Sequence, residues 1–234
     1  MKFKRILLKL SGEALEGSQG YGIDRERLRE YSEEIQSVAD DNVQVAIVIG
    51  GGNIFRGLQG VAEGMDRVQG DYMGMLATMI NSMALQATME KIGLKTALLS
   101  GLAIDPICEE MSRQRAVRYL NEGKVVIIAG GTGNPYFTTD TASALRALEI
   151  GADAIVKGTR VDGVYTTDPE KDPKAVRYES LGFDVAYSKG LKIMDLTAFT
   201  LCKENNLPIV VFNMNIKGNL KRLIRGEKIG TFVS

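Results

Sequence analysis

Residues 45–53 have the sequence Val-Ala-Ile-Val-Ile-Gly-Gly-Gly-Asn, in which a short β-branched run stops at three glycines. Similar short apolar runs lie at residues 6–10, 95–99, 125–128, 154–157 and 209–212. The runs are mostly continuous rather than alternating with polar residues, which is typical of parallel strands buried on both faces. They predict a sheet of central parallel strands.

Helical patterns lie between the predicted strands. Asp24 can cap a helix whose apolar residues recur with a period near 3.6, namely Leu28, Tyr31, Ile35, Val38 and Ala39. Ser112 can cap a second helix with apolar residues Ala116, Val117 and Leu120, and Gly123 can end it. The alternation predicts an α/β fold, a three-layer sandwich whose largely parallel central sheet carries helices on both faces.

No internal repeat or linker divides the chain. Turn-forming pairs become frequent after residue 158, at Asp162-Gly163, Asp168-Pro169 and Asp172-Pro173. We therefore expect residues 1–234 to form one domain. Residues 1–157 would form a first lobe, and residues 158–234 a second lobe that continues the same sheet.

The composition excludes several classes of chemistry. The chain has 234 residues, of which 26 are glycine and none is histidine. Without histidine there is no Ser-His-Asp or Cys-His hydrolase, no His-ligated metal site and no imidazole base. Basic and acidic residues each number 29, so the formal net charge is zero. That balance argues against a protein that mainly grips a nucleic-acid backbone.

The sequence predicts a cytoplasmic protein. Cys108 and Cys202 are far apart and form no CxxC motif, which is typical of reduced, buried thiols in the cytosol. The N-terminus is basic, but Lys9 and Ser11 interrupt the apolar run behind it, so it resembles neither a signal peptide nor a membrane anchor. No apolar run approaches the ~18–20 residues of a membrane span.

Glycine clusters follow three of the predicted strands, in the segments Ser11-Gly12, Gly50-Gly51-Gly52 and Gly130-Gly131-Thr132-Gly133. The carboxyl ends of parallel strands share one edge of the sheet, where ligands bind. Glycine there allows backbone N–H groups to approach phosphate oxygens. Tight turns also need glycine, but three such turns on one edge, two of them near Lys9 or Arg56, favour a polyphosphate site.

The common nucleotide-binding motifs are absent. The pair Gly123-Lys124 is followed by Val125, so there is no P-loop. No glycine run satisfies G-x-G-x-x-G, and protein-kinase signatures fail because they contain histidine. The predicted phosphate site therefore belongs to none of these classes.

Two lysines lie at the carboxyl ends of predicted strands. Lys9 lies within the run 6–10, and Lys157 ends the run 154–157. For Lys9 alone, the simplest explanation is an edge lysine whose stem packs while its head reaches water. A lysine at this position could instead act as a point charge on β- and γ-phosphates. The presence of a second such lysine favours the phosphate site.

Asp140 follows two threonines and precedes the helical pattern of Ala142, Leu145 and Leu148. The simplest structural role for Asp140 is to cap the N-terminus of this helix. Its functional explanation is that it pairs with the two lysines and holds them in place. Aspartates in the later turns, such as Asp162, are most simply turn residues.

Residues 71–92 form an apolar segment rich in methionine, and Gly93 can end it. Its apolar residues do not stay on one face of a helix, so all sides have to be covered. Two explanations stay open. The segment is either a core helix beneath another helix or a subunit interface, where flexible methionines are common.

Five segments resemble the bacterial uridylate kinases, a branch of the amino-acid kinase fold family. They span residues 9–15, 50–57, 71–78, 132–140 and 161–169, within a resemblance that extends in register from about Phe3 to the end. The blocks Thr132-Gly133-Asn134-Pro135 and Asp71-Tyr72-Met73-Gly74-Met75 are specific to this branch. The amino-acid kinases of the same fold share mainly the lysine and the glycine turns.

This resemblance implies transfer of a phosphoryl group from ATP, with magnesium, to UMP, as part of pyrimidine nucleotide biosynthesis. It implies that residues 1–157 mainly bind UMP and phosphate, and that residues 158–234 mainly bind ATP. The implied catalytic residues are Lys9, Arg56, Asp140 and Lys157, with Asp140 organising the lysines. An ionised phosphate acceptor needs no general base, which agrees with the absence of histidine.

The resemblance also implies the nucleotide contacts. The ATP-binding residues would be Lys9, Leu10, Ser11, Gly12, Gly52, Arg56, Thr159, Tyr165 and Asp168. The UMP-binding residues would be Gly51, Asp71, Thr132, Gly133, Asn134, Pro135, Tyr136, Phe137, Thr138 and Thr139, with Asp71 on the ribose hydroxyls. The protein ligands of the metal stay open.

Members of the family are typically homohexamers built from dimers, activated by GTP and inhibited by UTP. By position, the GTP-linked residues would be Gly17, Ser18, Gln19, Gly20, Tyr21 and Gly22. The resemblance implies no need for nucleic acid or membrane.

Two other functions stay open. A non-catalytic ligand-binding protein of this fold would be expected to lack a lysine or the aspartate, yet Lys9, Lys157 and Asp140 are all present. An amino-acid kinase would need an acceptor site for an α-amino acid, which the block 132–135 does not resemble.

Overall fold

The computed structural model describes residues 3–56 and 64–234; the other residues, among them Gly57 of the second motif, lie outside the described part. Its strands are β1 (Arg5–Leu10), β2 (Gln44–Ile49), β3 (Thr96–Ser100), β4 (Glu109–Glu110), β5 (Val125–Ala129), β6 (Ala154–Thr159), β7 (Ser180–Leu181), β8 (Ile209–Asn213) and β9 (Thr231–Val233). Its α-helices are α1 (Arg25–Ala39), α3 (Arg67–Lys91), α4 (Arg113–Asn121), α5 (Thr139–Ile150), α6 (Phe183–Ser188), α7 (Leu196–Glu204) and α8 (Asn219–Ile224). Two short 3-10 helices, η1 (Gly12–Leu15) and η2 (Gly17–Gln19), follow β1.

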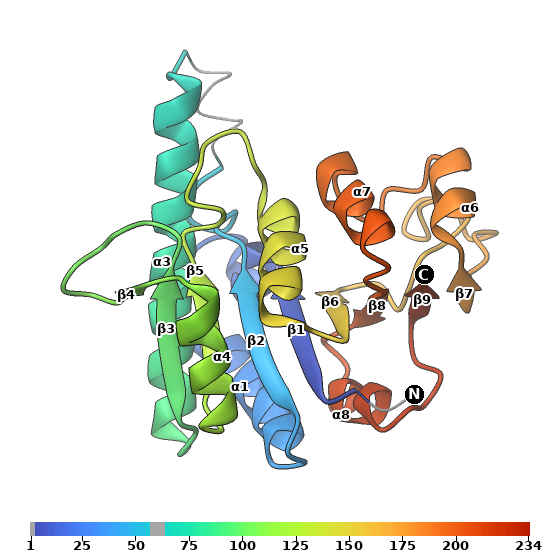
Figure 1. The fold of residues 1–234 in the computed structure, drawn as a ribbon. Coiled ribbons are helices and arrows are strands. Elements are labelled where there is room, and N and C mark those ends of the chain that lie inside the picture. The colour runs from blue at the N-terminus through green and yellow to red at the C-terminus, as the bar shows by residue number, and fades with distance from the viewer. Residues whose placement is uncertain (1–2, 57–63) are drawn as a thin grey trace.

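The strands form one nine-stranded sheet in the order β4-β3-β5-β2-β1-β6-β8-β9-β7. Neighbouring strands are parallel throughout except for β8 and β9, which are antiparallel. The largely parallel sheet predicted from the sequence is therefore confirmed. The central strands end at a common edge, at the top of Figure 1, and the loops that follow them meet there.

Helices cover both faces of the sheet, so the three-layer prediction is confirmed. One buried cluster joins the sheet to α1, α3 and α8, with members such as Ile35, Leu85 and Leu220. The second cluster joins the opposite face to α4, α5 and α7, through small residues such as Ala144 and Ala198. In Figure 1, α4 and α5 lie in front of the strands and α1 and α3 behind them.

The predicted helix ends are largely confirmed. The Asp24 carboxylate accepts the Arg27 N–H at 2.8 Å, and the Ser112 hydroxyl accepts the Arg115 N–H at 3.3 Å. The methionine-rich helix starts earlier than predicted, because Asp66 caps it and α3 begins at Arg67. Asp66, a polar residue directly before the helix, is the capping signal that would have placed this start correctly.

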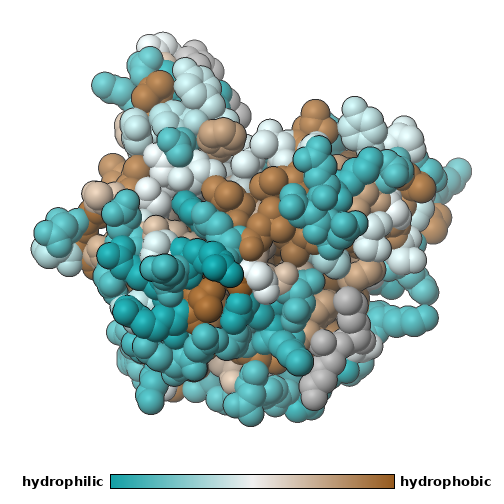
Figure 2. Space-filling model, in the orientation of Figure 1, coloured by the Kyte–Doolittle hydropathy of each residue, from teal (hydrophilic) through white to brown (hydrophobic). Residues whose placement is uncertain are grey.

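The two faces of α3 differ. Met75, Met79, Leu85 and Met89 are buried in the molecule. Tyr72, Met73, Leu76, Ile80 and Met83 remain 41–50% exposed. One end of α3 extends beyond the sheet in Figure 1 and stands clear of the body in Figure 2, beside a hollow along the loop edge. A core-helix explanation therefore accounts for only one face of α3.

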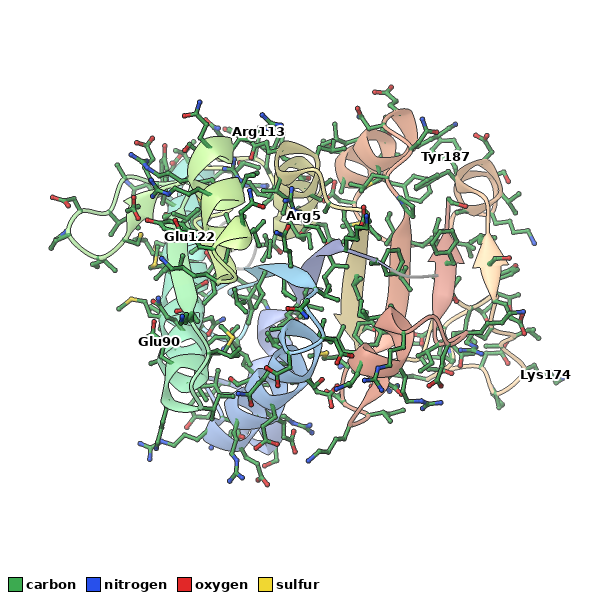
Figure 3. All side chains as sticks on the ribbon, turned by 60° about the horizontal axis from the view of Figure 1, so that its bottom comes forward. Arg5, Glu90, Arg113, Glu122, Lys174 and Tyr187 are labelled. Carbon is green, nitrogen blue, oxygen red and sulfur yellow. The ribbon has the colours of Figure 1, made fainter. Side chains whose placement is uncertain are left out.

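Charged side chains cover much of the remaining surface. Glu90, Arg113, Glu122 and Lys174 are all exposed and are labelled on the ribbon in Figure 3. Among the described residues, no helix is both long and apolar enough to cross a membrane. Both cysteines are unpaired, and burial raises the pKa of the Cys202 thiol to about 12, as expected for an inert packing residue.

Candidate active site

The two predicted lysines lie side by side at the centre of the sheet. β1 and β6 are parallel neighbours, and their register places Lys9 directly opposite Lys157. Side chains alternate between the faces of a strand, so Lys9 points to the same side as Leu7, toward the layer that contains α5. Lys9 is only 8% exposed on a central strand. The explanation of an edge lysine with a solvated head is therefore wrong.

Asp140 bridges the two lysines from the first turn of α5. Its carboxylate lies 2.6 Å from Lys9 Nζ and 2.9 Å from Lys157 Nζ. Lys157 Nζ also donates to the Ile193 carbonyl at 2.6 Å. These contacts confine two ammonium groups that would otherwise repel each other, and the three largely buried side chains together carry one net positive charge.

The electrostatics of this cluster follow from burial and pairing. Burial raises the pKa of Asp140, but the opposing charges and hydrogen bonds of Lys9 and Lys157 outweigh it, so the pKa lies below its ordinary value. Burial, and next the like charge of Lys9, lower the pKa of Lys157, although Asp140 partly offsets them. Asp140 is therefore ionised at neutral pH, whereas Lys157 loses its proton more readily than an ordinary lysine.

The N-terminus of α5 corrects one prediction. Thr138 caps this helix, and its hydroxyl accepts the N–H groups of Asp140 and Thr141 at 3.1 and 3.2 Å. Asp140 is therefore not the N-cap. With Thr138 as the cap, the Asp140 side chain is free to face the lysines.

Asp195 is a site residue that the sequence interpretation missed. Its carboxylate accepts hydrogen bonds from the hydroxyls of Thr138 and Thr141, the latter at 3.0 Å, and thereby ties the start of α5 to the second half of the chain. It also accepts the Ala198 N–H at 2.9 Å as the N-cap of α7. An aspartate immediately before a helical pattern is the available signal, and it identifies a cap rather than a site.

The glycine turns after β1 and β2 pack against each other. A Cβ atom at Gly12 would lie 2.6 Å from the Gly50 carbonyl oxygen, closer than any real contact, so only glycine fits there. The Gly50 N–H donates to the Leu10 carbonyl at 2.9 Å. Arg56 pairs with Glu13 and donates to the Gly52 carbonyl at 3.3 Å. The two predicted turns after β1 and β2 are thus packed together at the end of the strand that carries Lys9.

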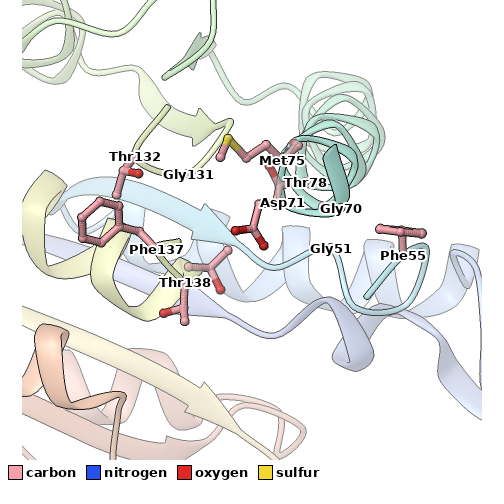
Figure 4. A pocket seen from close by; sticks show the side chains of 12 residues that line it. Gly51, Phe55, Gly70, Asp71, Met75, Thr78, Gly131, Thr132, Phe137 and Thr138 are labelled. Atoms are coloured by element: carbon pink, nitrogen blue, oxygen red, sulfur yellow. Dashed lines mark hydrogen bonds between the residues drawn. The ribbon is translucent and has the colours of Figure 1, made fainter. Parts of the chain in front are cut away.

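A cavity of about 140 Å³, here called the α3 cavity, opens between α3, the turn after β2 and the loop after β5 (Figure 4). Six predicted UMP residues line it, namely Gly51, Asp71, Thr132, Phe137, Thr138 and Thr139. The remaining four, Gly133, Asn134, Pro135 and Tyr136, do not. Lining residues that the sequence did not assign to the UMP site are Phe55, Gly70, Gly74, Met75, Thr78 and Gly131.

Asp71 is held in place at the mouth of this cavity. Its carboxylate accepts from Arg67 Nε at 2.8 Å and from the Tyr136 N–H at 2.7 Å. Tyr136 therefore belongs to the site through its backbone, with its ring 5.5 Å from the Arg67 guanidinium. Of the lining residues that the sequence did not assign to UMP, Gly70, Gly74, Met75 and Thr78 lie on α3. Their role depends on the position of this helix relative to the sheet, which no local pattern encodes.

A larger cavity of about 510 Å³, the β6 cavity, lies beyond Lys157 and is lined by the predicted residues Thr159, Tyr165 and Asp168. Other residues of the motif 161–169 also line it, and so do residues 189–193, which the sequence did not predict. The Tyr165 hydroxyl donates to the Asp162 carboxylate, so Asp162 has a partner as well as a turn position.

A third cavity, of about 570 Å³, adjoins the β6 cavity and is called the central cavity. Lys9, Ser11 and Lys157 line it, and it shares Thr159 and Asp168 with the β6 cavity. Two predicted ATP residues, Leu10 and Gly12, do not line the central cavity. The Leu10 side chain is fully buried in the core, and Gly12 packs against the turn after β2.

The segment predicted to respond to GTP lies close to these turns. Gly17 lines the central cavity, Tyr21 is 71% exposed, and the Gly22 N–H donates to the Asn53 carbonyl at 2.9 Å. Within residues 3–56 and 64–234, no group of three or more acidic or cysteine side chains is placed to hold a metal ion.

Comparison with known proteins agrees with this architecture. The model of the amino acid kinase family matches residues 4–213. The chain is 57% identical over 232 residues to the uridylate kinase of Parabacteroides distasonis, covering 99% of this chain and 98% of that protein. It is 57% identical to the uridylate kinase of Porphyromonas gingivalis, over 99% of this chain and 97% of that one.

Solved structures agree in fold. The UMP kinase of Bacillus anthracis superposes with a TM-score of 0.97 at 38% identity, covering 100% of this chain and 97% of that one. The uridylate kinase of Archaeoglobus fulgidus gives 0.77 at 29% identity, with both chains fully covered. The chain therefore belongs to the amino acid kinase family, in the branch of the uridylate kinases, and is a phosphotransferase of the nucleoside monophosphate kinase class.

Proposed function

We propose that this chain transfers the γ-phosphoryl group of ATP to UMP, yielding ADP and UDP. The cluster of Lys9, Asp140 and Lys157 carries the proposal, because it lies where the three cavities approach one another. Both lysines line the central cavity, Lys157 also lines the β6 cavity, and Thr139, directly before Asp140, lines the α3 cavity.

In the proposed transfer, a phosphate oxygen of UMP attacks the γ-phosphorus of ATP. The bond from that phosphorus to the β–γ bridging oxygen breaks, and ADP leaves with the electron pair. The attacking phosphate is already ionised near neutral pH, so no residue has to remove a proton. A chain without histidine can therefore perform this chemistry.

Lys9 and Lys157 would place positive charge beside the phosphoryl oxygens on which negative charge develops. Asp140 keeps both ammonium groups in position before substrate arrives, so no reorganisation is needed during the reaction. Arg56, beside Gly52, adds a cation at the glycine turns. This division of labour between three cations and one organising anion is the proposed catalytic role of the four residues.

UMP would occupy the α3 cavity, with Asp71 on the ribose hydroxyls and the loop 132–139 around the nucleotide. Adenosine would occupy the β6 cavity beside Thr159, Tyr165 and Asp168. The ATP phosphates would then extend through the central cavity past Ser11 and toward Lys9. This placement divides the one domain into an acceptor lobe, residues 1–157, and a donor lobe, residues 158–234, although the division falls inside β6.

Magnesium would enter with ATP rather than reside on the protein. In the described part of the chain, no cluster of three acidic side chains could cage it, and both Asp140 oxygens face lysines. Mg²⁺ at kinase sites is bound largely by substrate phosphates. MgATP is therefore the proposed substrate, and it supplies neutralising charge on the phosphates.

The remaining parts of the proposal concern assembly and regulation. The exposed apolar face of α3 supports a homo-oligomer, and we extend this to a homohexamer built from dimers. GTP would activate and UTP would inhibit, with residues 17–22 as the GTP-linked segment. The enzyme would work in the cytoplasm, in pyrimidine nucleotide biosynthesis, without nucleic acid or membrane.

A coupled ADP-release assay tests the reaction. Purified enzyme with MgATP is offered UMP, CMP, glutamate, aspartate and carbamate in separate reactions. We expect turnover with UMP well above that with the other acceptors. Turnover with an amino acid but not with UMP would refute the proposal and point to an amino-acid kinase, and no turnover with any acceptor would favour a ligand-binding role.

A further inference from the structure

A pair of buried amide side chains lies behind the glycine turns, outside all the residues discussed so far for catalysis. Asn81, in the middle of α3, is fully buried, and Asn53, after the second turn, is 6% exposed. The two amides bond reciprocally: Asn81 Nδ2 donates to Asn53 Oδ1 at 2.7 Å, and Asn53 Nδ2 donates to Asn81 Oδ1 at 3.1 Å.

Each amide also holds a different loop. Asn81 Nδ2 donates to the Gly50 carbonyl at 2.7 Å, in the turn after β2. Asn53 Nδ2 donates to the Gly22 carbonyl at 2.6 Å, at the end of the segment that follows η2. Because carbonyl oxygens only accept hydrogen bonds, these two contacts determine which way each amide is oriented.

The pair also meets the first glycine turn. A Cβ atom at Gly12 would lie 2.5 Å from Asn53 Oδ1, so the Gly12 backbone rests directly on this amide. The turn after β1, the turn after β2 and α3 are thus joined at one point. Moving Asn53 would change the spacing between the two turns.

We propose that Asn81, acting through Asn53, is a positioning residue that sets the spacing of the two glycine turns and thereby the alignment of the two phosphate chains. This inference rests on the proposed function, since alignment matters only if two phosphate-bearing substrates react here. Phosphoryl transfer depends on in-line geometry, and a misplacement of about 1 Å is enough to cost on the order of 10²-fold in rate.

The sequence position of Asn81 supports a role beyond helix formation. Asparagine is a poorer helix former than alanine by up to about 0.7 kcal/mol, and its amide is costly to bury without partners. In α3 that amide is satisfied only by groups outside its own helix. Neither asparagine lines the α3 cavity or the β6 cavity, so neither touches the nucleoside sites.

The test compares Asn81→Ala with Asn53→Asp and with Ser82→Ala as the control. Ser82 is the next residue of α3, is fully buried and has a hydroxyl without a partner, so its loss removes a polar group without touching the turns. Asn53→Asp keeps the acceptor for Asn81 Nδ2 and leaves the Asn81 bond to Gly50 intact. Steady-state kinetics with UMP and MgATP and a thermal melt are measured for each.

We expect Asn81→Ala to lower kcat at least 10-fold while both KM values stay within threefold of wild type and the protein remains folded at the assay temperature. Asn53→Asp should lower kcat by less, and Ser82→Ala should leave it unchanged. A kcat within twofold of wild type in Asn81→Ala, a loss confined to KM, or an equal loss in Ser82→Ala would overturn the proposal.

Two further outcomes remain separable. If Asn81→Ala does not fold, Asn81→Ser is measured under the same criteria, since its hydroxyl retains one donor. If the wild-type enzyme does not transfer phosphate to UMP, the proposed function is wrong. The Asn81 proposal is wrong if the wild type is active and the Asn81 variant is equally active.

Discussion

At the scale of single residues, the site depends on one carboxylate between two ammonium groups. Lys9 and Lys157 are adjacent because β1 and β6 pair in register, and like charges so placed in a buried site repel each other. Asp140 offsets that repulsion from a separate element. Each of the three side chains therefore depends on the other two for its position, and replacing one should alter the chemistry more than the binding of the nucleosides.

The substitution Asp140→Asn should lower kcat about 10²-fold or more, the scale of one lost electrostatic contact to the transition state. The KM for UMP should change little, because Asp140 does not line the α3 cavity. Steady-state kinetics with varied UMP give both values. Glu26→Gln, which removes an exposed charge from α1, is the charge-matched control and should behave as wild type. Normal turnover by Asp140→Asn would show that the role assigned to this residue is wrong.

The lowered pKa of Lys157 predicts an alkaline limit on activity. The cationic form is the active one, so kcat should fall as pH rises through a value below the ~10.4 of an ordinary lysine. The Asp140 carboxylate raises the pKa of Lys157. In Asp140→Asn, the alkaline limb of the pH–kcat profile should therefore move to lower pH. If the limb has the same midpoint in both proteins, a different group controls it.

At the scale of elements, α3 performs two functions with opposite faces. Its inner face supplies Met75 and Thr78 to the α3 cavity, and the Thr78 hydroxyl accepts the Gly130 N–H at 2.9 Å, which joins the helix to the loop after β5. Its outer face exposes large apolar side chains in a continuous helix. Exposed apolar patches of this kind mark interaction sites on proteins.

A charge placed on this outer face should disrupt association. Ile80→Glu places a carboxylate among Leu76, Met83 and their neighbours, where burying it against another subunit would be costly. We expect a smaller assembly than wild type by size-exclusion chromatography with light scattering. Gln114→Glu, on the exposed side of α4, is the charge-matched control. Equal masses for wild type and Ile80→Glu would exclude this face as the interface.

At the scale of the whole molecule, one sheet carries both substrate regions. β1 and β6 are adjacent, yet the elements that line the α3 cavity and the β6 cavity come from opposite halves of the chain. Asp195 joins the halves by accepting from Thr138 and Thr141. Ligands that bridge the halves should therefore stabilise the molecule as a unit.

Binding of UMP should raise the melting temperature of the protein. A ligand present at 100 times its Kd stabilises the native state by about 2.7 kcal/mol, which is a shift of several degrees for a chain of this size. Glutamate and aspartate at the same concentration should give no shift. Differential scanning fluorimetry measures this without turnover. A larger shift with an amino acid than with UMP would contradict the assigned acceptor.

Much of the fold was predictable because local patterns determine it. The apolar runs became the central strands, and Asp24 and Ser112 cap the helices expected of them, since capping and periodicity act over a few residues. The cap of α5 was misplaced by two residues, from Thr138 to Asp140. Threonine and aspartate are both good caps, so sequence alone does not separate them here.

The site was predictable in its residue types and incomplete in its members. Lys9, Lys157 and Asp140 were identified from strand ends and from family resemblance, and the ion pairs between them agree. Asp195 and Asn81 were not identified. Each acts through a partner more than 25 residues away, and no spacing rule reaches that far.

The sequence by itself determined the strands, the glycine turns at their ends and the exclusion of histidine chemistry, because these follow from local composition and chain sterics. Only the tertiary structure decided that Lys9 faces Lys157, that Asp140 bridges the two, and that Asn53 and Asn81 join the turns. Strand order and register set those distances, and they result from packing the whole sheet between its helices.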